Sequence, residues 1–265
     1  MKKHRLSLIL ILILFSWSCS EENDTFLNSD ADYFPLEVEN SWIYENRLNQ
    51  NTGNFQGTEL LSIDEKFQNR YGFTQTSDEL VGIFTSMLAS GKAYKQNGNQ
   101  KIILDGQFTI DLENQLSTIE IPMQDIVLYD ANSSLGNMMS SSSGKFQQNI
   151  NDFPVDFSYR INSVHQGFSI SKEINGVNYE DIFVSEIQVY LSAKVFIVFN
   201  DFTILQEQEI TSITNYYAKD IGLIFSDVRT DIIFEDIPEQ LEIDIPDVNF
   251  NSTQELESYL LNPSS

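Results

Sequence analysis

Alternation of apolar and polar residues dominates the chain. From Phe153 to Ile161 apolar side chains occupy every second position, and the same period recurs over residues 107–112 and 224–234. A period of two is the pattern of a strand with one buried face. The runs are separated by turn signals, namely Asn97-Gly98, Asp105-Gly106 and Asn175-Gly176. Many short strands joined by tight turns predict a mainly β fold, built as an antiparallel curled sheet, a half-barrel or a sandwich.

One or two short helices interrupt this pattern. Thr76 and Glu79 form a capping-box pair ahead of an apolar stripe that ends at Gly91. Ser252 and Glu255 form a second such pair near the end of the chain. We therefore expect a helix after each pair, the second one docking on the β body.

Three further segments carry specific expectations. Val195–Phe199 is apolar without alternation, which predicts a strand buried on both faces. Asn132–Gly144 is rich in serine and predicts a loop, either a surface loop or a flexible lid whose methionines adapt to an apolar mouth. His165, between Val164 and Gln166, is expected on the surface near a turn.

The start of the chain has its own pattern. Three basic residues within the first five positions precede the apolar run Leu6–Phe15, and the sole cysteine, Cys19, follows closely. The run is too short to span a bilayer, which takes about 20 residues. This order predicts an exported leader over residues 1–18 that is removed from the mature protein, in preference to a short buried helix.

Composition limits the partners. The chain carries 39 acidic and 15 basic residues, a formal net charge of −24. Loss of the basic leader makes the mature chain more acidic still, about −27. Such a charge opposes binding to nucleic acid, which is itself a polyanion. Hydrophobic residues make up 41% of the chain, enough for a sizeable core.

The residue inventory also limits the chemistry. With Cys19 modified and His4 lost in the leader, His165 is the last histidine, too few for a zinc site of the His/Cys type. Iron–sulfur ligation and haem attachment through cysteine fail for the same reason. The chain has neither a G-x-S-x-G nucleophile motif nor a phosphate-binding glycine loop. We expect no cofactor and no catalysis; a glycosidase using two carboxylates is the remaining enzymatic alternative.

Acidic residues crowd one segment near the end of the chain. Oxygen ligands suit Ca²⁺, although the spacing is not that of an EF-hand. A calcium site and a solvated acidic face both remain open for this segment, which contains Glu235, Asp236, Glu239, Glu242, Asp244 and Asp247.

The leader resembles a bacterial lipoprotein signal peptide, except that Trp17 stands where a small residue is usual. The resemblance implies acylation of Cys19, with palmitate-type chains, and two or more chains give a stable membrane anchor. Ser20, Glu21 and Glu22 resemble the acidic export tag of Bacteroidota surface lipoproteins. That likeness implies an outer-membrane protein exposed at the cell surface; an ordinary solvated tether is the alternative.

Two further motifs resemble a group of uncharacterised Bacteroidota lipoproteins. The first, of the form YFPLxxGNxWxY, begins at Tyr33 and here has Glu39 in place of the usual glycine. The second is a YYAxGxGL-type hairpin beginning at Tyr216, in which Asp220 replaces a glycine. The resemblance implies a curled antiparallel sheet or half-barrel and carries no activity. The residues themselves predict Trp42 and Tyr44 as core anchors and Gly222 at a turn or close backbone approach.

These observations divide the chain into a signal peptide, a lipid-anchored acidic tether, a β domain and an acidic C-terminal segment with a short helix, over residues 1–18, 19–32, 33–235 and 236–265. We expect a non-catalytic outer-membrane surface lipoprotein that binds an apolar or amphipathic ligand or a partner protein. An accessory or adhesion subunit of an outer-membrane complex is the main alternative, and the two-carboxylate glycosidase a more distant one.

Overall fold

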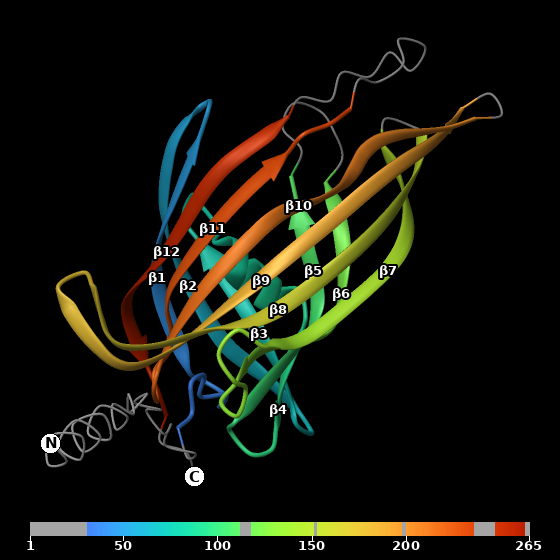
Figure 1. Ribbon diagram of the computed structural model, residues 1–265. Coiled ribbons are helices and arrows are strands. Elements are labelled where there is room, and N and C mark those ends of the chain that lie inside the picture. The colour runs from blue at the N-terminus through green and yellow to red at the C-terminus, as the bar shows by residue number, and fades with distance from the viewer. Residues whose placement is uncertain (1–30, 112–117, 151–152, 198–199, 236–246, 263–265) are drawn as a thin grey trace, which may run out of the picture.

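The computed structural model describes residues 31–111, 118–150, 153–197, 200–235 and 247–262. Twelve strands form one antiparallel sheet that curls until it nearly closes, with one short helix inside the curl (Figure 1). This confirms the predicted mainly β, curled antiparallel fold. The strands are β1 (Ser41–Gln50), β2 (Gly53–Phe67), β3 (Arg70–Ser77), β4 (Lys92–Gln96), β5 (Lys101–Ile110), β6 (Ile119–Asp130), β7 (Met138–Ile150), β8 (Phe153–Ile174), β9 (Val177–Ile197), β10 (Asn200–Ala218), β11 (Gly222–Ile232) and β12 (Val248–Leu260).

The sheet is an antiparallel meander in which the first and last strands also pair with each other. Sequential strands are neighbours, and β12 pairs with β1, so that the two ends of the described body meet in the middle of the sheet. The free edges are β6 and β7. Because connections alternate between the two ends of an antiparallel meander, β1 begins and β12 finishes at one end, together with the β2–β3, β4–β5, β6–β7, β8–β9 and β10–β11 turns. We call this the N-terminal end, and the other the distal end.

Serine side chains close the curl where the ladder stops. The hydroxyl of Ser140 on β7 accepts a hydrogen bond from the Val127 backbone N–H on β6, at 2.9 Å. Ser163 on β8 and Ser185 on β9 donate to the backbone carbonyls of Val127 and Leu128. Edge strands present unpaired backbone groups that cost free energy when buried. The three hydroxyls satisfy these groups on β6.

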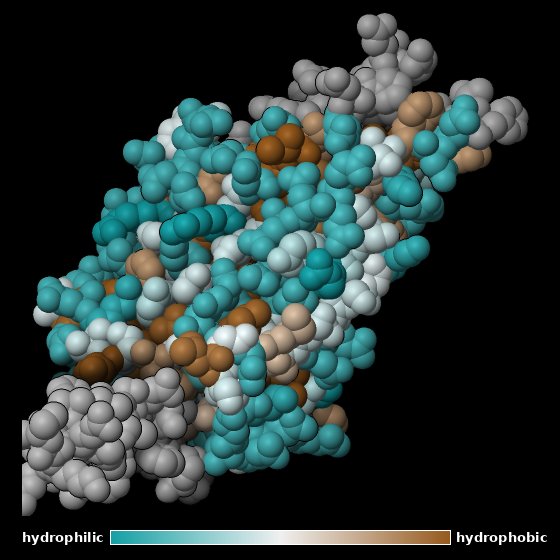
Figure 2. Space-filling model, in the orientation of Figure 1, coloured by the Kyte–Doolittle hydropathy of each residue, from teal (hydrophilic) through white to brown (hydrophobic). Residues whose placement is uncertain are grey.

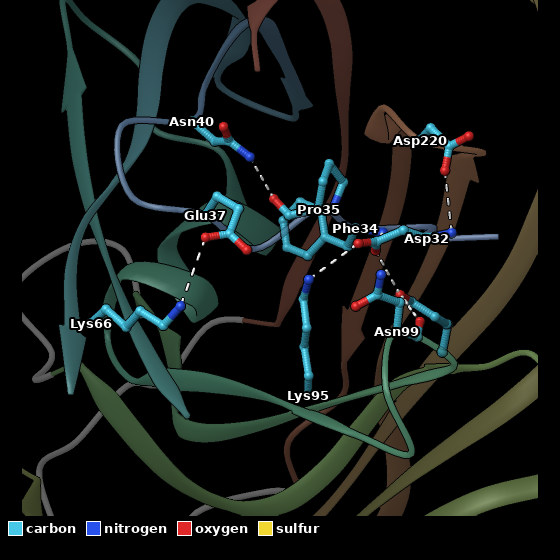
Figure 3. Close-up of polar contacts among 10 residues, drawn as sticks. Asp32, Phe34, Pro35, Glu37, Asn40, Lys66, Lys95, Asn99 and Asp220 are labelled. Carbon is cyan, nitrogen blue, oxygen red and sulfur yellow. Dashed lines mark hydrogen bonds and ion pairs between the residues drawn. The ribbon is translucent and has the colours of Figure 1, made fainter. Parts of the chain in front are cut away.

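The segment before β1 fills the N-terminal end of the curl. Tyr33, Phe34 and Leu36 are fully buried. Asp32 holds the segment in place: its carboxylate lies 3.2 Å from Nζ of Lys95 and accepts the Phe34 backbone N–H, and its backbone N–H donates to Asp220 (Figure 3). Tyr129 donates to the same carboxylate at 3.2 Å. Burial, and then the charge of Asp32, raises the pKa of the Tyr129 hydroxyl, which keeps this donor protonated.

Glu39 and Asp220, which stand where the resembled motifs have glycine, keep a glycine-like backbone. Glu39 has φ 72° and Asp220 has φ 59°, both in the left-handed region. Asp220 is of a residue type, Asp or Asn, that adopts this region more readily than most. Glu39 is held there by the hydrogen bond from its backbone N–H to the Ile63 carbonyl oxygen. Gly222, at φ 113°, meets the predicted requirement for close approach, since a Cβ there would lie 2.9 Å from the Phe34 ring. Trp42 and Tyr44 are fully buried, as predicted.

The first predicted helix exists but begins later than expected. Thr76 belongs to β3, and the helix α2 spans Ile83–Ala89 with Gly82 at its N-cap and no side-chain cap. The capping-box pattern was misleading because Thr76 pairs with Leu60 across the β2–β3 ladder.

The second predicted helix is wrong. Residues from Ser252 onward belong to β12, which is hydrogen-bonded to β1 on one side and β11 on the other. Val248, Ser252 and Leu256 face inward at even positions. Pairing with two strands outweighs the local capping signal, a tertiary override of propensity.

Three local expectations also change. Ser140 to Gly144 lie in β7, not in a loop, because they pair with β8. Gly106 lies within β5 beside a register shift, not at a turn. In the predicted apolar run Val195–Phe199, Val195 is buried but Phe196 is 60% exposed, so the described part of this strand has one exposed face; residues 198–199 lie outside the described residues. The Asn97-Gly98 and Asn175-Gly176 turns are confirmed, all four residues having positive φ.

We expect alkaline pH to loosen the N-terminal end. Burial, and then the charges of Asp181 and Asp220, raises the pKa of Tyr33 to about 12, above the value of about 10 in an unfolded chain. Between these two values the unfolded chain has lost a proton that the folded chain keeps, so the free energy of unfolding falls as pH rises through this window. Tyr33→Phe, which keeps the ring contacts with Tyr129 and Phe183, should make the fall shallower in denaturant titrations. Identical slopes for both proteins would contradict this assignment.

Candidate ligand-binding cavity

A buried carboxylate organises the interior. Glu59 on β2 faces into the curl and is 1% exposed. It accepts hydrogen bonds from the Gly82 backbone N–H at 2.9 Å and from the Thr85 hydroxyl at 2.6 Å, both at the start of α2. The side-chain amides of Gln75 and Gln254 donate to it at 2.8 and 2.7 Å. A carboxylate beside the first turn of a helix is also favoured by the partial positive charge there.

Gln254 completes the attachment of α2 to the opposite wall. Its side-chain oxygen accepts the Phe84 backbone N–H at 3.0 Å, which serves in place of a conventional N-cap. Gly82 permits this approach, because a Cβ at that position would lie 1.8 Å from the Gln254 amide nitrogen. The helix is therefore held between β2, β3 and β12, inside the curl.

Above α2 lies a cavity of about 630 Å³, toward the distal end. This volume falls within the range of small-molecule sites, about 300–1,000 Å³. Its lining comes from the distal ends of β1, β5, β11 and β12 and from α2 and the residues before it. Nine lining side chains are apolar, namely Leu48, Leu80, Val81, Ile83, Met87, Phe108, Ile110, Val248 and Phe250.

The other seven described lining residues are polar, and six of them are uncharged. Gln50, Ser86, Gln107, Thr109, Thr230 and Ser252 complete the described lining together with Asp111, the one charged residue among them. Asp111 and the 43%-exposed Val81 lie at the rim. Hydrolysis by two carboxylates needs a pair of carboxyl groups about 5–10 Å apart. The described lining supplies a single one.

A row of polar residues crosses the inner face below the cavity. His165, Ser185, Asn215, Ser226, Gln254 and Asn46 are successive cross-strand partners on β8, β9, β10, β11, β12 and β1, and all six are fully buried. Within the described residues, the Ser226 hydroxyl and the Asn46 side-chain oxygen have no hydrogen-bond partner. The Tyr217 hydroxyl lies beside the side chains of Ser185 and Asn215. Burial raises the pKa of Tyr217 well above its ordinary value. This row separates the aromatic base of the core from the apolar cavity.

His165 is not on the surface, and that prediction is wrong. Its ring is fully buried and stacks on Phe183, with centroids 4.4 Å apart. Its Nδ1 lies 2.8 Å from the Ser133 carbonyl oxygen. The inward parity of β8 places it there, and the register shift after His165 hides that parity in the sequence.

Several predicted sites lie outside the described residues. They include the lipid-attachment residue Cys19, the export-tag residues Ser20, Glu21 and Glu22, and most of the acidic C-terminal cluster. Of that cluster Glu235 and Asp247 are described. The Glu235 backbone N–H donates to the Ile204 carbonyl at 3.0 Å, and the Asp247 carboxylate accepts the Phe234 backbone N–H at 2.9 Å. Over the described ranges no group of acidic, histidine or cysteine side chains is arranged to hold a metal ion. No helix within those ranges has the length and hydropathy to cross a bilayer.

Comparisons with known proteins add little. No protein-family model matches the chain, and no curated protein matches it. Among solved structures, a crystal structure from Parabacteroides distasonis described as a "putative lipoprotein" aligns with 87% of this chain and 99% of its own, at 13% identity and a TM-score of 0.33. A likeness at this level carries no argument about function.

The Glu59 network predicts a large loss of stability on truncation. Glu59→Ala would leave the Gly82 N–H buried without an acceptor, at about 1–3 kcal/mol, and would remove the charged acceptor shared by the Thr85 hydroxyl and the amides of Gln75 and Gln254. We expect the free energy of unfolding to fall by about 3 kcal/mol or more in denaturant titrations. Glu120→Ala, at an exposed position on β6, is the control, with an expected change within about 0.5 kcal/mol. Equal effects would contradict the role of Glu59.

Proposed function

We propose that the protein is a non-catalytic, lipid-anchored outer-membrane surface lipoprotein whose curled sheet binds an apolar or amphipathic small molecule. The observation that carries the proposal is the cavity of about 630 Å³, lined mainly by apolar side chains. A well-packed protein interior leaves few voids larger than a water molecule. A space of this size beside a helix fixed by a buried polar network supports a binding role over a purely structural one.

The lining favours a particular class of ligand. No lysine or arginine is present among the described lining residues, and Asp111 lies at the rim. An anionic headgroup would therefore meet a carboxylate and no compensating cation, within a chain of net charge −24. The polar end of the ligand is neutral or cationic, and the uncharged, inward-facing side chains of Gln50, Thr230 and Ser252 are the ones positioned to hydrogen-bond with it.

Filling the cavity should abolish binding. Ser252→Phe places a ring in the cavity, whereas Asn251→Phe places the same ring on the outer face of the same strand. All three proteins are prepared as the chain from Ser20 onward, which lacks Cys19 and its anchor but keeps the Asp32 contacts. Titration with the neutral fluorophore N-phenyl-1-naphthylamine should show saturable binding for the unmodified chain and for Asn251→Phe, and at least about tenfold weaker binding for Ser252→Phe. Equal binding by all three, with unchanged thermal unfolding, would place the ligand elsewhere.

Headgroup charge should decide between ligands of equal chain length. We expect a monoacylglycerol to displace the fluorophore and the corresponding fatty-acid anion to do so far more weakly, because of Asp111. Asp111→Lys should reduce or reverse the difference in affinity between the monoacylglycerol and the fatty-acid anion. Asp111→Asn should reduce that difference by a smaller amount. Preferential binding of the anion by the unmodified chain would rule out the assigned ligand class.

A further inference from the structure

Exposed apolar side chains gather at the N-terminal end of the molecule. Leu135 and Met138 flank the β6–β7 turn, Ile170 and Val177 belong to the β8–β9 hairpin, and Tyr259 and Leu260 finish β12. The exposed fractions reach 71% for Leu135, 84% for Ile170 and 64% for Leu260. Figure 2 shows hydrophobic side chains among polar ones toward the lower left, the end at which the C label lies in Figure 1.

Contacts join these residues into one arc. Leu135 lies against Gly167 at the base of the β8–β9 hairpin. The hairpin then bends across the outer face of the sheet, where Lys172 lies over the rings of Tyr216 and Phe225, 4.2 and 4.3 Å from their centroids. At its tip, the Asn175 side-chain amide donates to the Leu256 carbonyl on β12 at 3.3 Å. The arc thus runs from the β6–β7 turn to the end of β12.

Three ion pairs lie at this end, whereas the carboxylates of Glu173, Glu180, Asp181 and Glu257 beside the arc are exposed. Lys66, Lys95 and Lys101 pair with Glu37, Asp32 and Asp130 at 3.7, 3.2 and 3.8 Å. Carboxylates that are already paired oppose approach to a neutral lipid surface less than free ones do.

The position of the tether indicates which end of the protein lies near the bilayer. Asp32, bonded to Asp220 in the β10–β11 turn, places the start of the described chain at the N-terminal end. Eleven residues separate Cys19 from Ala31, so the twelve Cα–Cα steps reach at most about 43 Å. A lipid on Cys19 would therefore hold this end closer to the bilayer than the distal end.

We propose that the arc of Leu135, Met138, Ile170, Val177, Tyr259 and Leu260 rests on the bilayer surface, so that the cavity opens away from the membrane. The inference rests on the lipid anchor of the proposed function. Its consequence is that the ligand enters from the aqueous side and is not drawn directly out of the supporting leaflet.

Site-specific fluorescence tests this orientation in the full acylated chain. Acylation occupies the only native cysteine, so Ile170→Cys and Ile233→Cys each provide one free thiol for an environment-sensitive dye. Ile233, 57% exposed near the distal end, is the matched control. In phosphatidylcholine vesicles containing nitroxide-labelled lipid, we expect a blue shift and at least about twofold quenching at position 170, and neither at position 233.

The opposing outcomes are distinct. Quenching at position 233 alone, or equal quenching at both positions, would overturn the orientation. An intact mass without acyl chains on Cys19 would overturn it as well. Fluorophore binding to the anchor-free chain is measured separately, so a protein that binds no ligand yet shows quenching at position 170 alone would refute the ligand proposal and leave the orientation standing.

Discussion

The interior of this protein depends on the buried carboxylate of Glu59. One side chain on β2 ties down the start of α2 and meets Gln254 from the opposite wall. Without an acceptor there, the first turn of α2 would bury unpaired N–H groups in an apolar space. With it, the helix crosses the curl as a fixed partition. The volume between α2 and the distal strand ends then stays open, whereas the volume on its other side is filled by aromatic rings such as Phe84 and Tyr217.

The two ends of the curl are accordingly different. At the N-terminal end Phe34 lies against Trp42 and Phe73, and Asp32 fixes the plug through Lys95 and Tyr129. At the distal end the walls are apolar and the rim is polar. A curled sheet with one filled end and one hollow end opens its cavity in a single direction, and under the proposed lipid anchor the tether sets where that direction points.

Much of the fold could be predicted because the inward-facing residues alternate. The alternation predicts both the strands and their buried faces at four residues that are buried in the structure, Trp42, Tyr44, Phe157 and Ile161. β12 could not be recognised, because its inward positions include Ser252 and Gln254, which resemble a capping segment until their neighbours on β1 and β11 are known. The same holds for Asn46, Asn215 and His165: buried polar residues have no signature in a hydrophobicity pattern. The cavity was beyond prediction, since it depends on where α2 enters the curl and not on any motif.

The most direct test of this account is native mass spectrometry, with lipid extraction, on the protein purified from its own membranes. We predict a stoichiometric adduct of neutral or cationic apolar character, retained by the unmodified chain and lost in Ser252→Phe. A clean mass of the ligand-free protein, unchanged after incubation with neutral lipids, would contradict the binding role and leave the cavity without a small-molecule occupant.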